Sequence, residues 1–105
     1  KGGFIMVIVL FDVKLKNTTS AARNAELVAH LQESLANTPG FIKSESFVKD
    51  GDPLHMMDIT YWEDEAAVTA WRSHSEHRMA QKEGKDGLFS EYVITVADVI
   101  RRYGK

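Results

Sequence analysis

Residues 41–62 read FIKSESFVKDGDPLHMMDITYW, and this stretch decides the fold. Residues 41–49 alternate loosely between apolar and polar side chains, which favours a strand. Residues 54–62 have the same character and include several aromatic and β-branched residues. Between the two lies the sequence Asp-Gly-Asp-Pro at 50–53, a strong turn signal. The sequence therefore predicts a β-hairpin over residues 41–62.

Two further strands are expected, one near each end of the chain. Residues 5–14, IMVIVLFDVK, are rich in Val, Ile and Phe, which is typical of a well-buried strand. Residues 91–100, EYVITVADVI, have the same composition. Each segment would place one set of side chains on each face of a sheet, and both sets are apolar.

Two helices are expected between these strands. Residues 21–36 repeat apolar side chains at helical spacing, after a polar cluster at 17–20 that can cap a helix. Asn37, Pro39 and Gly40 would end it. A second helix is expected to open at 63–65, because carboxylates suit the positive end of the helix dipole. It would run to His74 and continue from Ser75 through Gln81.

The resulting order is β-α-β-β-α-β, the split βαβ pattern of a ferredoxin-like α+β fold. We expect residues 1–105 to form a single domain with a four-stranded antiparallel sheet and both helices on one face. Nothing in so short a chain is left to cover the second apolar face. We therefore expect a second copy of the chain to cover it, which makes the protein a homodimer.

Composition excludes several classes of function. The chain has 105 residues, a net charge of -2 and mixed charges, so it lacks the basic face that binds nucleic acid or an anionic membrane. It has no cysteine, which excludes disulfides and thiolate chemistry. No apolar run approaches a membrane span. We expect a cytoplasmic protein, in which Met6 is the natural start and residues 1–5 are a vector remnant.

A family resemblance is carried by the second half of the chain. Residues 61–68, YWEDEAAV, are followed by Ala70-Trp71-Arg72, Glu76-His77-Arg78, Ala80-Gln81 and Gly84. Together with the tail 92–104 and Pro39-Gly40-Phe41, this order resembles the antibiotic biosynthesis monooxygenase (ABM) family of the dimeric α+β barrel superfamily. The most specific part is residues 61–84.

The resemblance implies a homodimer with its two sheets face to face, and a pocket in each subunit between the helices and the sheet. Characterised members oxygenate aromatic polyketides or quinols without a metal or flavin, so no cofactor is expected. Other members of the superfamily degrade haem. Trp71 matches that branch, but Gln81 stands where the iron-ligating histidine is expected, and Phe11 replaces an asparagine. Haem degradation is therefore disfavoured.

Histidines and a tryptophan are the first candidates for the site. Trp71 is either a core anchor or a pocket wall that stacks on a planar substrate, and these roles overlap. His74 and His77 are spaced to share one helix face. They lack an obvious third metal ligand, so no metal site is predicted. His77 is preferred as the base that takes a proton from a phenolic substrate, and His74 is assigned to substrate binding.

Three aromatic residues complete the predicted substrate site. Tyr61 and Trp62 end a strand and must point to opposite faces. Either could face the pocket, and we favour Tyr61. Phe11 on the first strand would shape the pocket, and Phe89 before the last strand could act as a lid.

Two functions remain open. The first is a cofactor-independent monooxygenase that acts on a small aromatic or quinol-type molecule. The second is a non-catalytic ligand-binding or stress-response dimer of the same fold, since a fold does not fix a function.

Overall fold

A computed structural model describes residues 6–74, 82–83 and 87–105. Its elements follow the predicted order β-α-β-β-α-β. They are β1 (Val7–Leu15), α1 (Thr18–Leu35), β2 (Phe41–Lys49), β3 (Asp52–Trp62), α2 (Glu65–Arg72) and β4 (Phe89–Asp98). The predicted continuation of the second helix through 75–81 lies outside the described residues.

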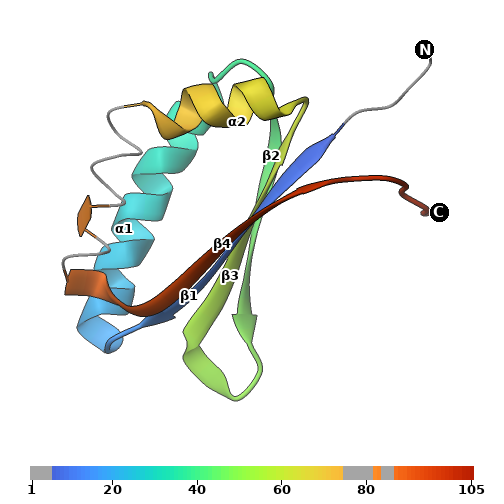
Figure 1. The fold of residues 1–105 in the computed structure, drawn as a ribbon. Helices are drawn as coiled ribbons and strands as arrows, with labels where there is room; N and C mark the ends of the chain where they lie inside the picture. The colour runs from blue at the N-terminus through green and yellow to red at the C-terminus, as the bar shows by residue number, and fades with distance from the viewer. Residues whose placement is uncertain (1–5, 75–81, 84–86) are drawn as a thin grey trace, which may run out of the picture.

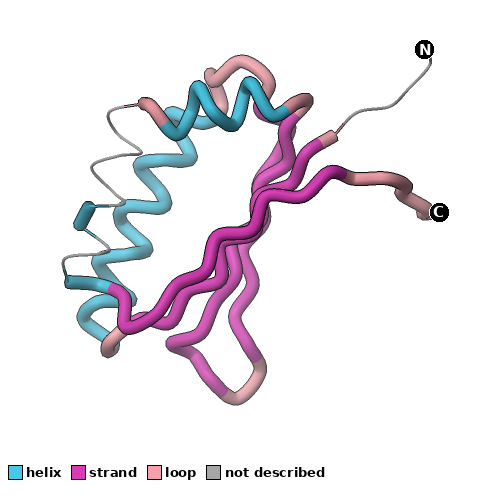
Figure 2. Tube along the Cα trace, viewed as in Figure 1, coloured by secondary structure: helices cyan, strands magenta, loops and turns pink. Residues whose placement is uncertain are grey.

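The strands form one antiparallel sheet in the order β2-β3-β1-β4. Helices α1 and α2 both pack on the same side of this sheet, and no described helix lies on the other side (Figure 1, Figure 2). The predicted ferredoxin-like α+β fold is therefore confirmed. Among the described helices, none is both long and apolar enough to cross a membrane.

Both helices begin at a polar cap. The Asn17 side chain accepts a hydrogen bond from the Ser20 amide at 2.8 Å, as the polar cluster at 17–20 predicted. The Asp64 side chain accepts one from the Ala67 amide at 2.8 Å. These bonds satisfy backbone donors that lack a partner inside the helix. They fix where α1 and α2 start relative to the sheet.

The main core cluster lies at one end of the sheet, and Val13, Leu15 and Leu88 are buried near the other end of β1. The main cluster contains the two tryptophans and three aliphatic residues: Val7, Leu35, Trp62, Val68 and Trp71. Gly40, which precedes β2, has a φ of +84°, and a Cβ built there would lie 2.4 Å from the Ala67 Cβ. Glycine is required at this position by both its backbone conformation and the close approach of α2.

Strand alternation assigns each residue to one face of the sheet. The face under the helices carries the odd-numbered residues of β1 from Val7 to Val13 and their partners Trp62, Thr60, Asp58 and Met56 on β3. The opposite face carries the neighbouring residues. These include Ile8, Leu10, Asp12, His55, Met57, Ile59 and Tyr61, together with Phe47 and Val93 from the edge strands.

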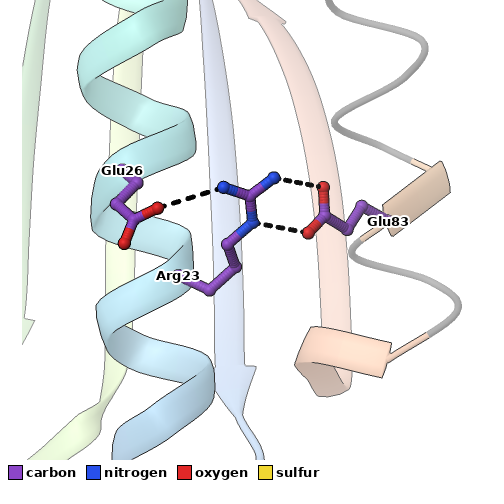
Figure 3. Close-up of polar contacts among 3 residues, drawn as sticks. All are labelled: Arg23, Glu26 and Glu83. Atoms are coloured by element: carbon purple, nitrogen blue, oxygen red, sulfur yellow. Dashed lines mark hydrogen bonds and ion pairs between the residues drawn. The ribbon is translucent and has the colours of Figure 1, made fainter.

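An exposed arginine fork links α1 to the chain that precedes β4. Arg23 donates from Nε to Glu83 Oε1 at 2.6 Å and from Nη2 to Glu83 Oε2 at 3.1 Å, while its Nη1 donates to Glu26 Oε2 at 3.1 Å (Figure 3). The hydrogen bond from Arg23 lowers the pKa of Glu83. The fork ties Glu83, which lies 60 residues away in sequence, to the outer side of α1.

Candidate ligand pocket between α1 and the sheet

A pocket of about 160 Å³ lies between α1 and the helix-covered face of the sheet. The sheet forms the floor of the pocket. On the α1 side most of the lining residues are apolar and two are polar: Leu27, Val28, Leu31 and Leu35, with Asn24 and Gln32. Most of the exposed lining is apolar, as in sites that bind hydrophobic small molecules. The pocket lies between a helix and the sheet, where the family resemblance implies one.

Aromatic residues gather at both ends of the pocket. At one end the Trp62 and Trp71 rings lie 6.4 Å apart, and Phe41 meets Trp62 edge to face at 5.4 Å. At the other end Phe11 meets Phe89 edge to face at 5.4 Å. Aromatic walls of this kind suit a flat, apolar ligand.

The floor of the pocket has two halves, and the boundary between them runs along the direction of the strands. Two rows of side chains cross the sheet from β2 to β4, and in each row the partners face one another across the strands. The rows are Ser46–Asp58–Phe11–Ile94 and Ser44–Thr60–Val9–Val96. The β2 and β3 half of the floor is therefore polar, and the β1 and β4 half is apolar.

Asp58 lies on this floor in the same row as Phe11. Its Oδ1 accepts a hydrogen bond from the Ser46 hydroxyl at 2.6 Å, and Phe11 flanks it on the other side. Burial raises the pKa of the Asp58 carboxyl, against a smaller lowering effect of the bond from Ser46. An acid with a raised pKa in an apolar pocket is a candidate functional group.

Glu45 and Arg72 are the other charged residues among those that line the pocket. Glu45 pairs with Ile59 and so belongs to the opposite face of the sheet, where its Oε1 accepts a hydrogen bond from the Tyr61 hydroxyl at 2.8 Å. Arg72 is exposed and ends α2. Asp58 is therefore the carboxylate best placed to meet a ligand within the described lining.

Three of the predicted substrate residues do line this pocket. Phe11, Trp71 and Phe89 all contribute to its wall. Trp71 is also part of the buried core, with 6% of its surface exposed, so its two anticipated roles coincide. Whether these residues bind a substrate, and whether Phe89 acts as a lid, stay predictions.

Tyr61 is the exception, and the expectation that it faces the pocket is wrong. Tyr61 pairs with Ile8 on the opposite face of the sheet, where Lys43 Nζ lies 4.7 Å from its ring centroid. The hydrogen bond to Glu45 raises the pKa of the Tyr61 hydroxyl. Trp62, the alternative left open by the sequence, is the residue that enters the pocket. Its indole Nε1 donates to Thr60 Oγ1 at 2.8 Å.

None of the histidines that the structure describes is part of the pocket lining. His74 stacks on Trp71 with a ring-centroid distance of 5.2 Å and lines a separate hollow with Ser34 and Pro39. His55 is on the opposite face, with its Nε2 2.6 Å from Asp12 Oδ1. His77, the predicted base, lies outside the described residues. No group of acids and histidines suited to a metal ion occurs in the described parts of the chain.

Sequence reasoning missed Asp58 as a site residue, although a signal was present. Asp58 and Trp62 are four residues apart on one strand and therefore share a face. Once Trp62 is assigned to the pocket, Asp58 follows. With Tyr61 predicted to face the pocket, Asp58 was assigned to the face of the sheet away from the pocket.

The chain matches a known protein family. The sequence model of the family described as "Antibiotic biosynthesis monooxygenase" matches residues 5–83. The chain is 33% identical over 69 residues to the jasmonate monooxygenase ABM of Pyricularia oryzae, covering 66% of this chain and 32% of that protein. This chain thus spans about a third of that relative's length. It is 32% identical over 95 residues to protein YqjZ of Bacillus subtilis, covering 90% and 79%.

A solved structure supports the fold alone. The structure of Rv0793 from Mycobacterium tuberculosis superposes with a TM-score of 0.82 at 10% identity, covering 94% of this chain and 99% of that one. At so low an identity the likeness shows a shared fold, and it carries no information about substrate.

Proposed function

Because the chain belongs to the antibiotic biosynthesis monooxygenase family, we propose that it is a cofactor-independent monooxygenase of a small aromatic or quinol-type molecule. The observation that carries this proposal is the pocket under α1. It is apolar, aromatic at both ends and supplied with one carboxylate on its floor. Such a pocket fits a flat ring system that bears a few oxygen substituents.

The proposed reaction uses the electrons of the substrate itself. In an anthrone, for example, a proton is removed and the resulting anion reduces molecular oxygen, forming a hydroperoxide at the reacting carbon. Loss of water then leaves a new carbonyl, so one oxygen atom enters the product and the other leaves as water. The protein has to bind the ring, accept the proton and stabilise the anion. Arg72 supplies a cation at the pocket for the last of these tasks.

A histidine base and a homodimer belong to the same proposal. His77 is the base that the sequence predicts. The second copy would cover the face opposite the helices, where Phe47 and Val93 are 53% and 61% exposed. Apolar side chains on a sheet face without a helix favour burial against another chain. The expected cytoplasmic location also stays a prediction.

The direct test is oxygen consumption by the purified protein with hydroquinones, naphthoquinols and anthrones. We expect uptake of one oxygen molecule per anthrone converted, with the quinone as product. His77→Ala is the variant that tests the predicted base, and Lys49→Ala on the exposed hairpin is a control. Absence of uptake with every compound would contradict the proposal.

A non-catalytic binding dimer is the second candidate. It is favoured by one observation, that no described histidine lines the pocket. In that case the same aromatic compounds would bind, as followed by quenching of tryptophan fluorescence from Trp62 and Trp71, but they would not be converted.

A further inference from the structure

The pocket floor has two chemically different halves, and this division carries information about how a ligand lies. Ser44 and Ser46 of β2 and Asp58 and Thr60 of β3 line one half. The facing residues of β1 and β4 that line the other half are Val9, Phe11, Ile94 and Val96, all without a polar side-chain atom. A ring system with oxygen on one edge and hydrocarbon on the other would match both halves in one orientation only.

Within the polar half, hydrogen bonds already occupy part of the available groups. Thr60 Oγ1 accepts from the Trp62 indole, and the Ser46 hydroxyl donates to Asp58. Asp58 has the larger unused capacity, because an ionised carboxylate has two oxygens and about four acceptor positions. Within the described residues, Oδ1 is the only carboxylate oxygen of Asp58 that accepts a hydrogen bond. A ligand hydroxyl over this half would therefore meet an acceptor that can also take its proton.

We propose that Asp58 is the residue that accepts the proton of the substrate hydroxyl, and that the substrate lies with its hydroxyl-bearing edge over β2 and β3. This inference rests on the proposed monooxygenase function, and it assigns the proton acceptor to Asp58 on the floor of the sheet in place of His77, the base that the sequence predicts. It makes Asp58 a catalytic residue, because its carboxylate would touch the reacting group.

The electrostatics of the site agree with this role. An aspartate with an unshifted pKa is a weak base near neutral pH. General-base catalysis improves when the pKa of the base approaches the operating pH. Burial moves the pKa of Asp58 in that direction. The bond from Ser46 works against burial, since it stabilises the charged form. Ser46 thus stabilises the charged form of the carboxylate and holds Oδ1 in place.

The proton and electrons can be followed through the step. The O–H bond of the phenol, or of the enol form of an anthrone, breaks and its proton passes to Asp58. The electron pair stays on the ring system, which then reduces oxygen to the hydroperoxide anion. Asp58 returns the proton to that anion, and water is lost as the carbonyl forms. The carboxylate is regenerated, and oxygen is the only oxidant that the step needs.

The test compares two aspartates on opposite faces of one sheet. Asp58→Asn keeps the size of the side chain and its acceptor oxygen for Ser46, but it removes the base. Asp12→Asn is the matched control outside the pocket. Each variant is mixed with anthrone without oxygen, and the long-wavelength absorbance of the anthrone anion is measured. We expect the anion with the wild type and with Asp12→Asn, and its loss with Asp58→Asn.

The same variants are then given oxygen. Loss of a general base costs roughly 10²–10⁴-fold in rate, so Asp58→Asn should fall by that factor while anthrone binding changes little. Ser46→Ala provides a second readout that a merely structural role would not produce. It removes the bond that lowers the pKa of Asp58, so activity should be lost at a higher pH as the solution is acidified.

The possible outcomes separate this inference from the proposed function. Anion formation that depends on Asp58, with no oxygen uptake, would support the proton acceptor and contradict the monooxygenase. Oxygen uptake that survives in Asp58→Asn with an unchanged pH profile would overturn the inference and leave the monooxygenase standing. Loss of the anion in His77→Ala but not in Asp58→Asn would assign the base to His77 and overturn it as well.

Discussion

The two faces of the central strands each carry an aspartate with a short hydrogen bond, and the two bonds differ in their partners. On the helix-covered face, Asp58 Oδ1 lies 2.6 Å from the Ser46 hydroxyl. On the opposite face, Asp12 Oδ1 lies 2.6 Å from His55 Nε2. The distances are equal, but a hydroxyl carries no charge, whereas a protonated histidine can neutralise a carboxylate. The comparison shows that two equally short hydrogen bonds to aspartates can involve partners of different chemistry.

The surroundings reinforce this difference. Asp58 lies under α1 among apolar walls, and burial raises its pKa. His55 Nδ1, on the other face, is buried and has no hydrogen-bond partner within the described structure. An unsatisfied buried polar atom costs about 1–3 kcal/mol. The helix-covered face thus holds a pocket with a carboxyl group of raised pKa, while the opposite face holds a ring nitrogen without a hydrogen-bond partner in the described structure.

The largest expected difference in the free energy of unfolding is between variants of two neighbouring aromatic residues that lie on opposite faces. Trp62 is 1% exposed and belongs to the core, so Trp62→Ala should lower the free energy of unfolding by about 3–5 kcal/mol. Tyr61→Ala, on the opposite face, should cost clearly less. Urea unfolding measures both. Equal losses would contradict the assignment of the two residues to different environments.

The next test uses two glycines that share a left-handed backbone. Gly40→Ala should cost roughly 2–4 kcal/mol, because it combines strain of about 1 kcal/mol with overpacking of about 1–3 kcal/mol against Ala67. Gly51 has a φ of +81° and open space, so Gly51→Ala should show the strain alone. The difference, measured by urea unfolding, reports how tightly α2 is held against the helix-covered face. Ala67→Gly should recover part of the loss in Gly40→Ala.

A smaller effect is expected for the association of two chains. Phe47 and Val48 are adjacent on β2 and similarly exposed, at 53% and 57%, but they lie on opposite faces. Phe47→Glu should weaken the proposed dimer by at least about tenfold, or about 1.4 kcal/mol. Val48→Glu, on the helix side, is the control. Analytical ultracentrifugation measures the dissociation constant of the dimer for each variant. If Phe47→Glu left that constant unchanged, this face would be excluded as the interface.

The smallest effect concerns the exposed fork on α1. Arg23→Gln removes both bonds to Glu83, but ion pairs at the surface contribute little. We expect a slight fall in Tm that shrinks further in high salt, where such pairs are screened. The formation of the pair lowers the pKa of Glu83, so its contribution should be present at neutral pH and disappear as the pH falls through that lowered pKa. A large, salt-independent loss would indicate that the fork has a greater structural role.

The fold was more accessible from sequence than the site, and the reason is periodicity. Strand β2 was predicted with its observed bounds, because alternation is a local signal. A cap within residues 17–20 was also predicted, but α1 begins at Thr18, three residues before the predicted start at residue 21. The ends of β4 moved by two residues, from 91–100 to Phe89–Asp98. Such limits depend on pairing with β1, which sequence alone does not fix.

The site depended on which face the helices cover, and periodicity does not supply that information. Both sets of side chains on β1 are apolar, so the alternation of Tyr61 and Trp62 could be assigned either way. Trp71, Phe11 and Phe89 were found because aromatic residues draw attention by type. Asp58 lies in a strand between apolar neighbours, and its role becomes visible only when Ser46 and the pocket are placed around it.

The division of the pocket floor has a consequence for how new specificities could arise. The serine, threonine and aspartate side chains of the floor all come from one β-hairpin, Phe41–Trp62, whereas the facing half comes from two strands distant from each other in sequence. A short, contiguous stretch of the gene therefore encodes the polar residues of the floor, and the apolar half of the floor is encoded elsewhere. Exchange of that hairpin between relatives would change which oxygen pattern is recognised while the cavity keeps its shape.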